Sequence, residues 1–261
     1  MIFLKKIFRQ ILPFFVVKKY DDLLNLRVKS KEIETQLATF NKHSESLSNN
    51  RFECNWEDKS IKNEDKTTTT QFDAHYLYHP AWAARKLNEI KPKKHIDISS
   101  YLDFSTLVSA FIDIDFYDLR PAKIQLSGLT CSKADATNLP FKNNSIESIS
   151  CMHVIEHIGL GRYGDKIDPE GDIKAIDELK RVTKDHGHIY FAVPIGGTAK
   201  IQFNAHRIYT YSMVLKLFEK FDVIDFSLIT DSGEFFTQAT QKLSDQQKYG
   251  CGCFLLKKNT D

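Results

Sequence analysis

Short apolar segments alternate with longer amphipathic ones from Gln71 to the end of the chain. Seven of the apolar segments have the length and the branched or aromatic composition of strands. They are Lys94–Ile98, Ile112–Asp118, Leu126–Cys131, Ile146–Met152, His188–Val193, Val223–Ile229 and Cys251–Leu256.

Helical patterns lie before and between these strands. Pro80 suits the first turn of a helix, Pro92 ends it, and Thr210 is a suitable N-cap for a later one. The predicted helices are Ala81–Ile90, Ile173–Val182 and Thr210–Phe218.

The alternation indicates an α/β domain, with a mainly parallel sheet covered by helices on both faces. Such sheets bind ligands at the carboxyl ends of their strands, where the strand order reverses. The residues that follow the first four strands are therefore the first candidates for function. Only about eight residues separate the second and third strands, which is short for a crossover helix, so we expect a loop or a single turn there.

The first seventy-one residues differ from the rest. Residues 1–30 mix large apolar side chains with Lys and Arg, and most of the apolar ones fall on one helical face. This pattern fits a helix in the membrane interface beside anionic lipid, or equally a helix docked on its own domain. Residues 31–71 form a predicted polar linker, in which Lys31–Phe40 can extend the helix. Residues 72–261 form the predicted main domain.

Composition excludes some classes of protein. The longest apolar run at the N-terminus, Ile11–Val17, is far shorter than the roughly twenty residues that span a bilayer, and no cleavage site for a secretory signal follows it.

The 36 basic and 34 acidic residues nearly balance, so we expect no nucleic-acid partner. The five cysteines include Cys251-Gly-Cys253, which lacks the second ligand pair of a zinc site. We predict no metal site and a cytoplasmic protein, placed at the inner face of the membrane if the N-terminus binds lipid.

Two motifs indicate the chemistry. Ala134–Phe141 reads Ala-Asp-Ala-Thr-Asn-Leu-Pro-Phe, and Ser148–His157 is an apolar strand that ends in Glu-His. Together they resemble the middle of class I methyltransferases, which use S-adenosylmethionine. The resemblance implies a Rossmann-like seven-stranded sheet. It also implies that adenine lies near Asp135 and Ala136, and that Met152 lies at the reactive end of the cofactor.

The end of the first strand departs from this resemblance. Methyltransferases usually have glycines here, so that the backbone approaches the cofactor closely. This chain has Asp97 and then Ser99, Ser100 and Tyr101. We assign Asp97 and Ser99 to cofactor binding, because small serines can admit the ligand, whereas Tyr101 is harder to accommodate. The alternative is a Rossmann-like domain that has lost its cofactor.

Asp118 ends the second strand and is the candidate for binding the ribose hydroxyls. The alternative is a turn-forming aspartate, since Pro121 follows three residues later.

The loop after the fourth strand contains a formal G-x-G-x-x-G at Gly159, Gly161 and Gly164. A dinucleotide fingerprint passes directly from the first strand into a helix. These glycines follow the fourth strand instead of the first, and Asp165 comes after them instead of a helix. This context disfavours a nicotinamide site.

His157 and Glu156 are the predicted catalytic residues. Imidazole titrates near neutral pH, so His157 can act as general base toward an acceptor hydroxyl, with Glu156 orienting it. His153 lies four residues before His157, but that spacing aligns metal ligands only on a helix, and His153 follows a strand. The alternative is that Glu156 and His157 satisfy backbone groups of the loop.

The segment Glu156–Asp165, Glu-His-Ile-Gly-Leu-Gly-Arg-Tyr-Gly-Asp, resembles the signature of a family of methyltransferase-like proteins classed as a domain of unknown function. The match extends through Asp118–Pro121, Pro194–Gly197 and Asn204–Arg207, and covers roughly residues 72–229. Members are similar in replacing the glycines of the first loop.

The predicted substrate-binding residues lie, like Glu156, at the carboxyl ends of the predicted strands. Arg162 and Arg207 can grip a carboxylate or phosphate, although an ion pair of Arg207 with Asp165 that fixes the loop is the alternative. The full set is Arg162, Asp165, Asn204, His206 and Arg207.

The sequence thus predicts an S-adenosylmethionine-dependent methyltransferase. The basic amphipathic start favours an acceptor made at the membrane surface, such as a lipid-linked or nucleotide-linked sugar in glycan biosynthesis. One alternative is a methyltransferase-fold module that binds a ligand or partner without chemistry. Another is a different nucleotide-dependent enzyme on the same fold.

Overall fold

The structure is a computed structural model that describes residues 14–45, 47, 52–62 and 65–260. The chain divides into two compact units, Met1–Gln71 and Phe72–Asp261, and each is described by itself.

The N-terminal unit is built on one long helix. Helix α2 covers Phe14–Glu45, and a short 3-10 helix, η1, covers Trp56–Asp58. Helix α2 continues through Lys31–Phe40, as we predicted that it can, and ends at Glu45, because the Lys, Glu, Gln and Ala residues of this segment have high helix propensity. Residues 1–13 of the predicted amphipathic segment lie outside the described residues. Among the helices of the described residues, none has the length and hydropathy that a membrane crossing requires.

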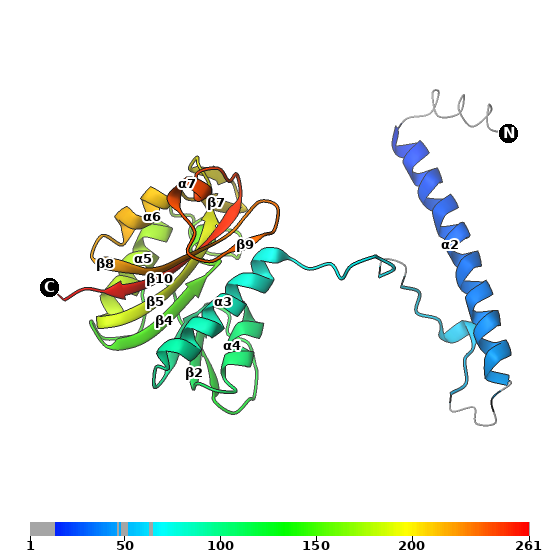
Figure 1. Ribbon diagram of the computed structural model, residues 1–261, viewed down its shortest axis with the longest axis horizontal. Helices are drawn as coiled ribbons and strands as arrows, with labels where there is room; N and C mark the ends of the chain where they lie inside the picture. Colours follow the sequence, from blue (N-terminus) through cyan, green and yellow to red (C-terminus); the bar gives the residue numbers. More distant parts are fainter. Residues whose placement is uncertain (1–13, 46, 48–51, 63–64, 261) are drawn as a thin grey trace. The chain divides into compact units, whose positions relative to one another are not determined.

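The C-terminal unit contains an eight-stranded sheet with the order β3-β2-β1-β4-β5-β10-β8-β9 (Figure 1). Strands β1 to β5 are parallel, whereas β10 runs antiparallel to both β5 and β8. The predicted α/β class and mainly parallel sheet are confirmed, and the two-residue β9 is added at the edge. The strands are β1 His95–Ile98, β2 Ile114–Asp118, β3 Leu129–Lys133, β4 Ile146–Met152, β5 Thr183–Ile195, β8 Phe221–Ile229, β9 Phe235–Phe236 and β10 Gly250–Lys258.

Helices cover both faces of the sheet (Figure 1). Helices α3 (Ala74–Ile90) and α4 (Leu102–Val108) pack on one face, where Trp82, Leu87 and Phe104 are buried. Helices α5 (Gly171–Val182) and α6 (Tyr211–Leu217) pack on the other, where Ile176, Leu179 and Phe218 are buried. This double layer excludes water from both sides of the parallel strands, as their nearly continuous apolar sequences require.

The ends of two predicted helices can be compared with the structure. Thr210 is the N-cap of α6, and its side chain accepts a hydrogen bond from the amide of Met213, as predicted. Helix α3 begins six residues before Pro80, so our placement of Pro80 in the first turn was wrong. Asp73 caps the earlier start by accepting from the amide of Tyr76 (3.2 Å). Burial of Trp82 and Leu87 holds the helix together beyond the proline.

Three small elements lie beyond the carboxyl edge of the sheet and were not predicted. A 3-10 helix, η2 (Ile155–His157), follows β4 directly. The hairpin of β6 (Lys200–Gln202) and β7 (His206–Ile208) follows β5, and β7 packs against η2. The short helix α7 covers Gln241–Ser244, between β9 and β10. As predicted, the connection between β2 and β3 contains no helix.

Candidate functional site

A cavity of about 280 Å³ lies at the carboxyl ends of β1 to β4. Its position agrees with the rule for open α/β sheets. Six of the predicted site residues line it. They are Ser99, Asp118, Asp135, Ala136, His157 and Asp165. The remaining lining residues are Leu119, Arg120, Ala134, His153, Val154, Ile158 and Tyr163.

The turn after β1 reaches the cavity without a glycine. Ser99 has φ 55°, a left-handed conformation that glycine adopts most readily, and its hydroxyl donates to the carbonyl of Tyr117 (3.1 Å). Tyr101 does not line the cavity. It is 43% exposed and its ring packs edge-on against that of Tyr76. The obstruction that Tyr101 presents in the sequence is therefore absent from the fold.

Asp97 lies within the sheet and does not line the cavity, contrary to its predicted contact with the cofactor. Its fully buried carboxylate accepts hydrogen bonds from Ser105 (2.7 Å) and Ser150. Ser150 in turn bonds the ring of His95 (2.9 Å). Burial raises the pKa of Asp97 to about 6, despite these hydrogen bonds, because the charged form loses its hydration. The carboxylate thus links strands β1 and β4 beneath the site.

Met152, also assigned to the cofactor, is fully buried against α3 and α4 and is not a lining residue. Its amide donates to the hydroxyl of Ser100 (3.1 Å), which ties the end of β4 to the turn after β1. The resemblance indicated the edge of the sheet at which the cavity lies, but the direction in which each side chain points depends on the strand pleat.

The raised pKa of Asp97 gives a stability prediction. A carboxyl whose folded pKa exceeds its unfolded value stabilises the fold as it is protonated, so its contribution grows as pH falls. Between pH 7.5 and pH 5, we expect the free energy of unfolding of the wild type to rise by about 1.4 kcal/mol relative to Asp97→Asn. Urea denaturation of both proteins at the two pH values measures this difference. A constant difference would show that the carboxyl titrates normally.

The carboxylates of Asp118 and Asp135 line the cavity at the ends of β2 and β3. Asp118 accepts from the amide of Arg120 (2.6 Å) through one oxygen, and Asp135 accepts from the amide (2.9 Å) and hydroxyl (2.7 Å) of Thr137 through one oxygen. Asp118 is thus turn-forming, as our alternative proposed. The two assignments are compatible, because the second oxygen of each carboxylate makes no hydrogen bond within the described residues and remains able to accept one.

Glu156 and His157 lie in η2. Glu156 is fully buried, and its Oε1 accepts from Nδ1 of His153 (2.7 Å) and lies 3.7 Å from Nε2 of His157. Nδ1 of His157 lies 2.6 Å from the carbonyl of Ala205 and therefore carries the hydrogen, which leaves Nε2 as the acceptor in the neutral ring. Burial lowers the pKa of His157, and the charge of Glu156 opposes that shift. The neutral, proton-accepting form is therefore available at neutral pH.

Asp165 organises the glycine loop. Its Oδ2 accepts from the amides of Gly159 (2.8 Å) and Gly161 (3.3 Å), and its Oδ1 accepts from that of Tyr163 (3.2 Å). Partial burial acts to raise the pKa of Asp165, but these hydrogen bonds together outweigh it, so the pKa is lowered. Both glycines have positive φ and close the loop around this carboxylate. No helix begins until Gly171, so the loop lacks the strand-to-helix passage of a dinucleotide motif.

Arg207 is buried and binds backbone carbonyls at both ends of the glycine loop. Its guanidinium donates to the carbonyls of Ile158 (2.6 Å) and Pro169 (3.3 Å), and its Nε lies 3.5 Å from Asp172. An ion pair that fixes the loop is therefore present. Our alternative named Asp165 as the acidic partner of Arg207, but the partner is Asp172. With its donors turned toward the protein, Arg207 does not line the cavity.

The other predicted substrate-binding residues do not line the cavity. Arg162 is exposed, donates to the carbonyl of Ala205 (3.2 Å) and stacks over the ring of Tyr163. Nε2 of His206 donates to Oε1 of Gln202 (2.6 Å), and the His206 ring stacks on Tyr249. Asn204 is exposed in the turn between β6 and β7.

The pattern of apolar and polar positions did not identify Arg120 and Tyr163 as residues of the cavity. Arg120 and Tyr163 come from different loops, and the Arg120 guanidinium lies 5.1 Å from the centre of the Tyr163 ring. Arg120 belongs to the Asp-Leu-Arg-Pro segment and Tyr163 to the Glu-His-Ile-Gly segment, so both lie inside motifs that the sequence analysis singled out. Their meeting across the cavity depends on the strand order and not on local sequence.

The sequence matches the model of a known protein family. Residues 126–258, slightly more than half of the chain, match the model of a family described as "Caenorhabditis protein of unknown function, DUF268". The chain belongs to the DUF268 family. A protein of Methanocaldococcus jannaschii, itself uncharacterised, is 24% identical to this DUF268 member over 145 residues, which are 54% of this chain and 55% of that protein. The chain thus spans about half the length of that curated relative.

Solved methyltransferase structures share the fold of this DUF268 member. A candidate sarcosine dimethylglycine methyltransferase from Galdieria sulphuraria has a TM-score of 0.51 and 14% identity, over 70% of this chain and 86% of that one. A chain of the complex between the Haloferax volcanii Trm112 methyltransferase activator and a candidate methyltransferase has a TM-score of 0.50 and 14% identity, over 72% of this chain and 91% of that one. The likeness shows that the domain has the Rossmann-like fold of class I methyltransferases.

Proposed function

We propose that this DUF268 member is a methyltransferase that uses S-adenosylmethionine. The observation that carries the proposal is the cavity itself, which brings Ser99, Asp118 and Asp135 together with His157 at the carboxyl edge of the sheet. Two carboxylates with an accepting oxygen available, a small residue after β1 and a histidine at the far side suit a nucleoside cofactor beside a reacting hydroxyl.

Each cofactor residue has a distinct task in this proposal. Asp118 accepts hydrogen bonds from the ribose hydroxyls, and Asp135 with the backbone of Ala136 binds the adenine edge. Ser99, in its left-handed conformation, lets the backbone approach the methionine part. When bound, the cofactor supplies an electrophilic methyl group on a sulfonium. The carboxylates and the Tyr163 ring provide negative potential for that positive charge.

His157 is the proposed general base. Its Nε2 is the acceptor of the neutral ring and would take the proton of an acceptor hydroxyl. The ring then carries a positive charge, which the buried Glu156 carboxylate at 3.7 Å stabilises. Glu156 is therefore a positioning and electrostatic residue, and the carbonyl of Ala205 fixes the tautomer.

The proposed acceptor is a lipid-linked or nucleotide-linked sugar. Its support is the mixture of basic and large apolar residues over positions 1–30, which fits attraction to an anionic membrane surface. Arg162 and Arg120 flank Tyr163 and offer guanidinium groups for a phosphate of such an acceptor. A binding module without chemistry is the competing function, and it is favoured by the absence of glycines after β1.

Calorimetric titration with S-adenosylhomocysteine tests the proposal. We expect micromolar binding to the wild type and a loss of roughly 10-fold to 100-fold in affinity for Asp118→Asn, because one Asp118 oxygen accepts from the Arg120 amide and an amide nitrogen in place of the other oxygen cannot accept from the ribose. Asp113→Asn is the matched control, since Asp113 is exposed just before β2 and far from its carboxyl end. Absence of heat at millimolar ligand, or equal loss in both variants, would contradict the proposed cofactor.

A further inference from the structure

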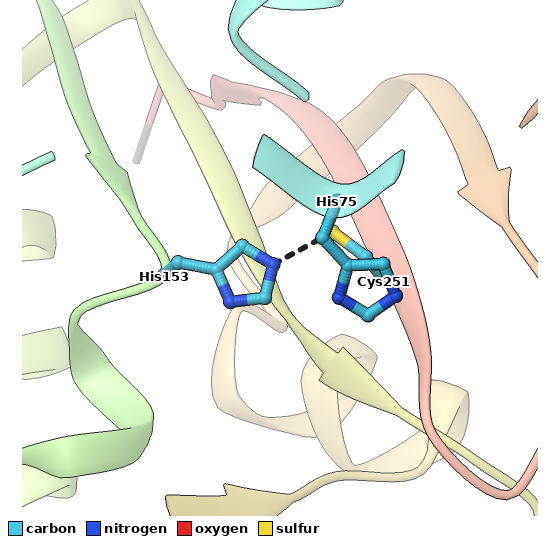
Figure 2. A group of neighbouring side chains, drawn as sticks. All are labelled: His75, His153 and Cys251. Atoms are coloured by element: carbon cyan, nitrogen blue, oxygen red, sulfur yellow. Dashed lines mark hydrogen bonds between the residues drawn. The ribbon is translucent and has the colours of Figure 1, made fainter. Parts of the chain in front are cut away.

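Three side chains of types that can bind metal ions converge beside the cavity from distant parts of the chain. His75 comes from the first turn of α3, His153 follows β4, and Cys251 lies at the start of β10 (Figure 2). One ligand atom of each lies within 4.8 Å of those of the other two. Nε2 of His153 is 3.2 Å from Sγ of Cys251. The proposed methyl transfer uses none of the three.

The spacing of these atoms suits a small ion. Tetrahedral coordination at ordinary zinc bond lengths separates neighbouring ligand atoms by roughly 3.5 Å, so the cluster requires only a small contraction. Two imidazoles and a thiolate are a ligand set that zinc prefers, whereas magnesium and calcium take oxygen ligands. Three protein ligands also leave a fourth position for water or another molecule, which is the pattern of reactive zinc sites.

Glu156 supplies the outer support that metal-binding histidines usually have. Its Oε1 accepts from Nδ1 of His153 (2.7 Å), which fixes the ring and leaves Nε2 directed toward Cys251. A carboxylate behind a ligand histidine raises the basicity of the coordinating nitrogen. Oε2 of the same fully buried carboxylate has no hydrogen-bond partner within the described part of the chain. The neutral rings of His153 and His157 and the Cys251 thiol carry no charge that compensates this buried carboxylate at rest, whereas a nearby divalent cation would.

The surroundings hold the cluster in place before any ion binds. The His75 ring stacks on both His153 and Tyr249, with ring centres 5.3 Å apart in both pairs. His79, one turn further along α3, is fully buried with its ring centre 5.0 Å from that of His153, and its Nε2 has no partner within the described residues. Cys251 is fully buried. The ligands are thus fixed by a helix and two strands of one sheet.

We propose that His75, His153 and Cys251 bind a zinc ion. The Cys251 thiol, which donates to Nε2 of His153 in the free protein, loses its proton to solvent, and the metal takes the place of that hydrogen bond. Because His153 also lines the cavity, the ion lies beside the proposed cofactor pocket with its fourth position open. Metal binding rests on this geometry alone and does not depend on the proposed methyl transfer.

Titration of the full, chelator-treated protein with cobalt, followed by displacement with zinc, tests the site. We expect one ion per chain, with the absorption of a sulfur-to-cobalt charge transfer that zinc removes. Cys251→Ser should abolish that absorption and weaken zinc binding by at least about 100-fold, and His75→Ala and His153→Ala should weaken it comparably. Glu156→Gln should cost roughly 10-fold to 100-fold while keeping the absorption.

Cys253→Ser is the matched control. Cys253 is also a buried thiol on β10, and its sulfur lies 3.9 Å from that of Cys251, but it does not belong to the three-residue cluster. The control should bind zinc as the wild type does, and circular dichroism verifies that every variant is folded. Absence of the charge-transfer absorption, or zinc binding that Cys251→Ser leaves unchanged, would overturn the proposal. So would an equal loss in Cys253→Ser.

Discussion

Gly159→Ala is expected to lower the free energy of unfolding by about 3 to 5 kcal/mol. Gly159 has φ +80°, and a Cβ there meets the carbonyl oxygen of Asp168, while the two backbones are joined by a hydrogen bond from the Asp168 amide (2.9 Å). The substitution therefore combines left-handed strain with a clash against backbone that cannot move separately. Urea denaturation measures the loss.

Gly164→Ala separates the two causes. Gly164 has nearly the same φ, +81°, but a Cβ there meets nothing within 4 Å. Only the conformational cost of about 1 to 2 kcal/mol should appear. We also expect Gly159→Ala to weaken S-adenosylhomocysteine binding, because Ile158 and Asp165 of the same loop line the cavity. Equal destabilisation by the two substitutions would show that the Asp168 contact does not constrain the loop.

Arg207→Met is expected to cost about 3 to 5 kcal/mol of stability, because it leaves a buried carboxylate without its cation. Asp172 is 5% exposed and has Arg207 and the hydroxyl of Tyr209 (2.8 Å) as its partners. Burial raises the pKa of Tyr209 well above its usual value, so this hydroxyl remains a neutral donor and cannot replace the guanidinium charge. The carbonyls of Ile158 and Pro169 lose their donors at the same time.

Two further variants test the cause of that loss. Arg162→Met removes an exposed guanidinium from the same loop region and should change stability by less than about 0.5 kcal/mol. Adding Asp172→Asn to Arg207→Met should recover part of the loss, because the asparagine carbonyl still accepts from Tyr209 but carries no charge. If the double variant is no more stable than Arg207→Met, the lost backbone contacts and not the unpaired charge dominate. Denaturant unfolding of all four proteins decides between these causes.

The proposed zinc site could not be predicted from the sequence, because its three ligands lie far apart along the chain. The Cys251-Gly-Cys253 motif lacked a second ligand pair nearby, so we predicted no metal. Residues on one strand face are neighbours at every second position, and Cys253 accordingly lies close to Cys251. The histidines that approach Cys251 come from α3 and from the end of β4, and no local spacing relates them to β10.

The sequence by itself determined the order of the elements and the edge that carries the cavity. Alternating apolar strands and amphipathic helices fix a parallel sheet, since buried backbone groups must pair and apolar faces must be covered. Asp118 ends a strand, and Asp135 and His157 follow strands in the chain, so these residues were predictable at that edge. The tertiary structure alone decided that Asp97 points toward Ser105 of α4 and away from the cavity, that Arg207 pairs with Asp172, and which side chains gather around Cys251. Periodicity reports local geometry, whereas these contacts depend on strand order, on the pleat and on burial, which exist only once the chain has folded.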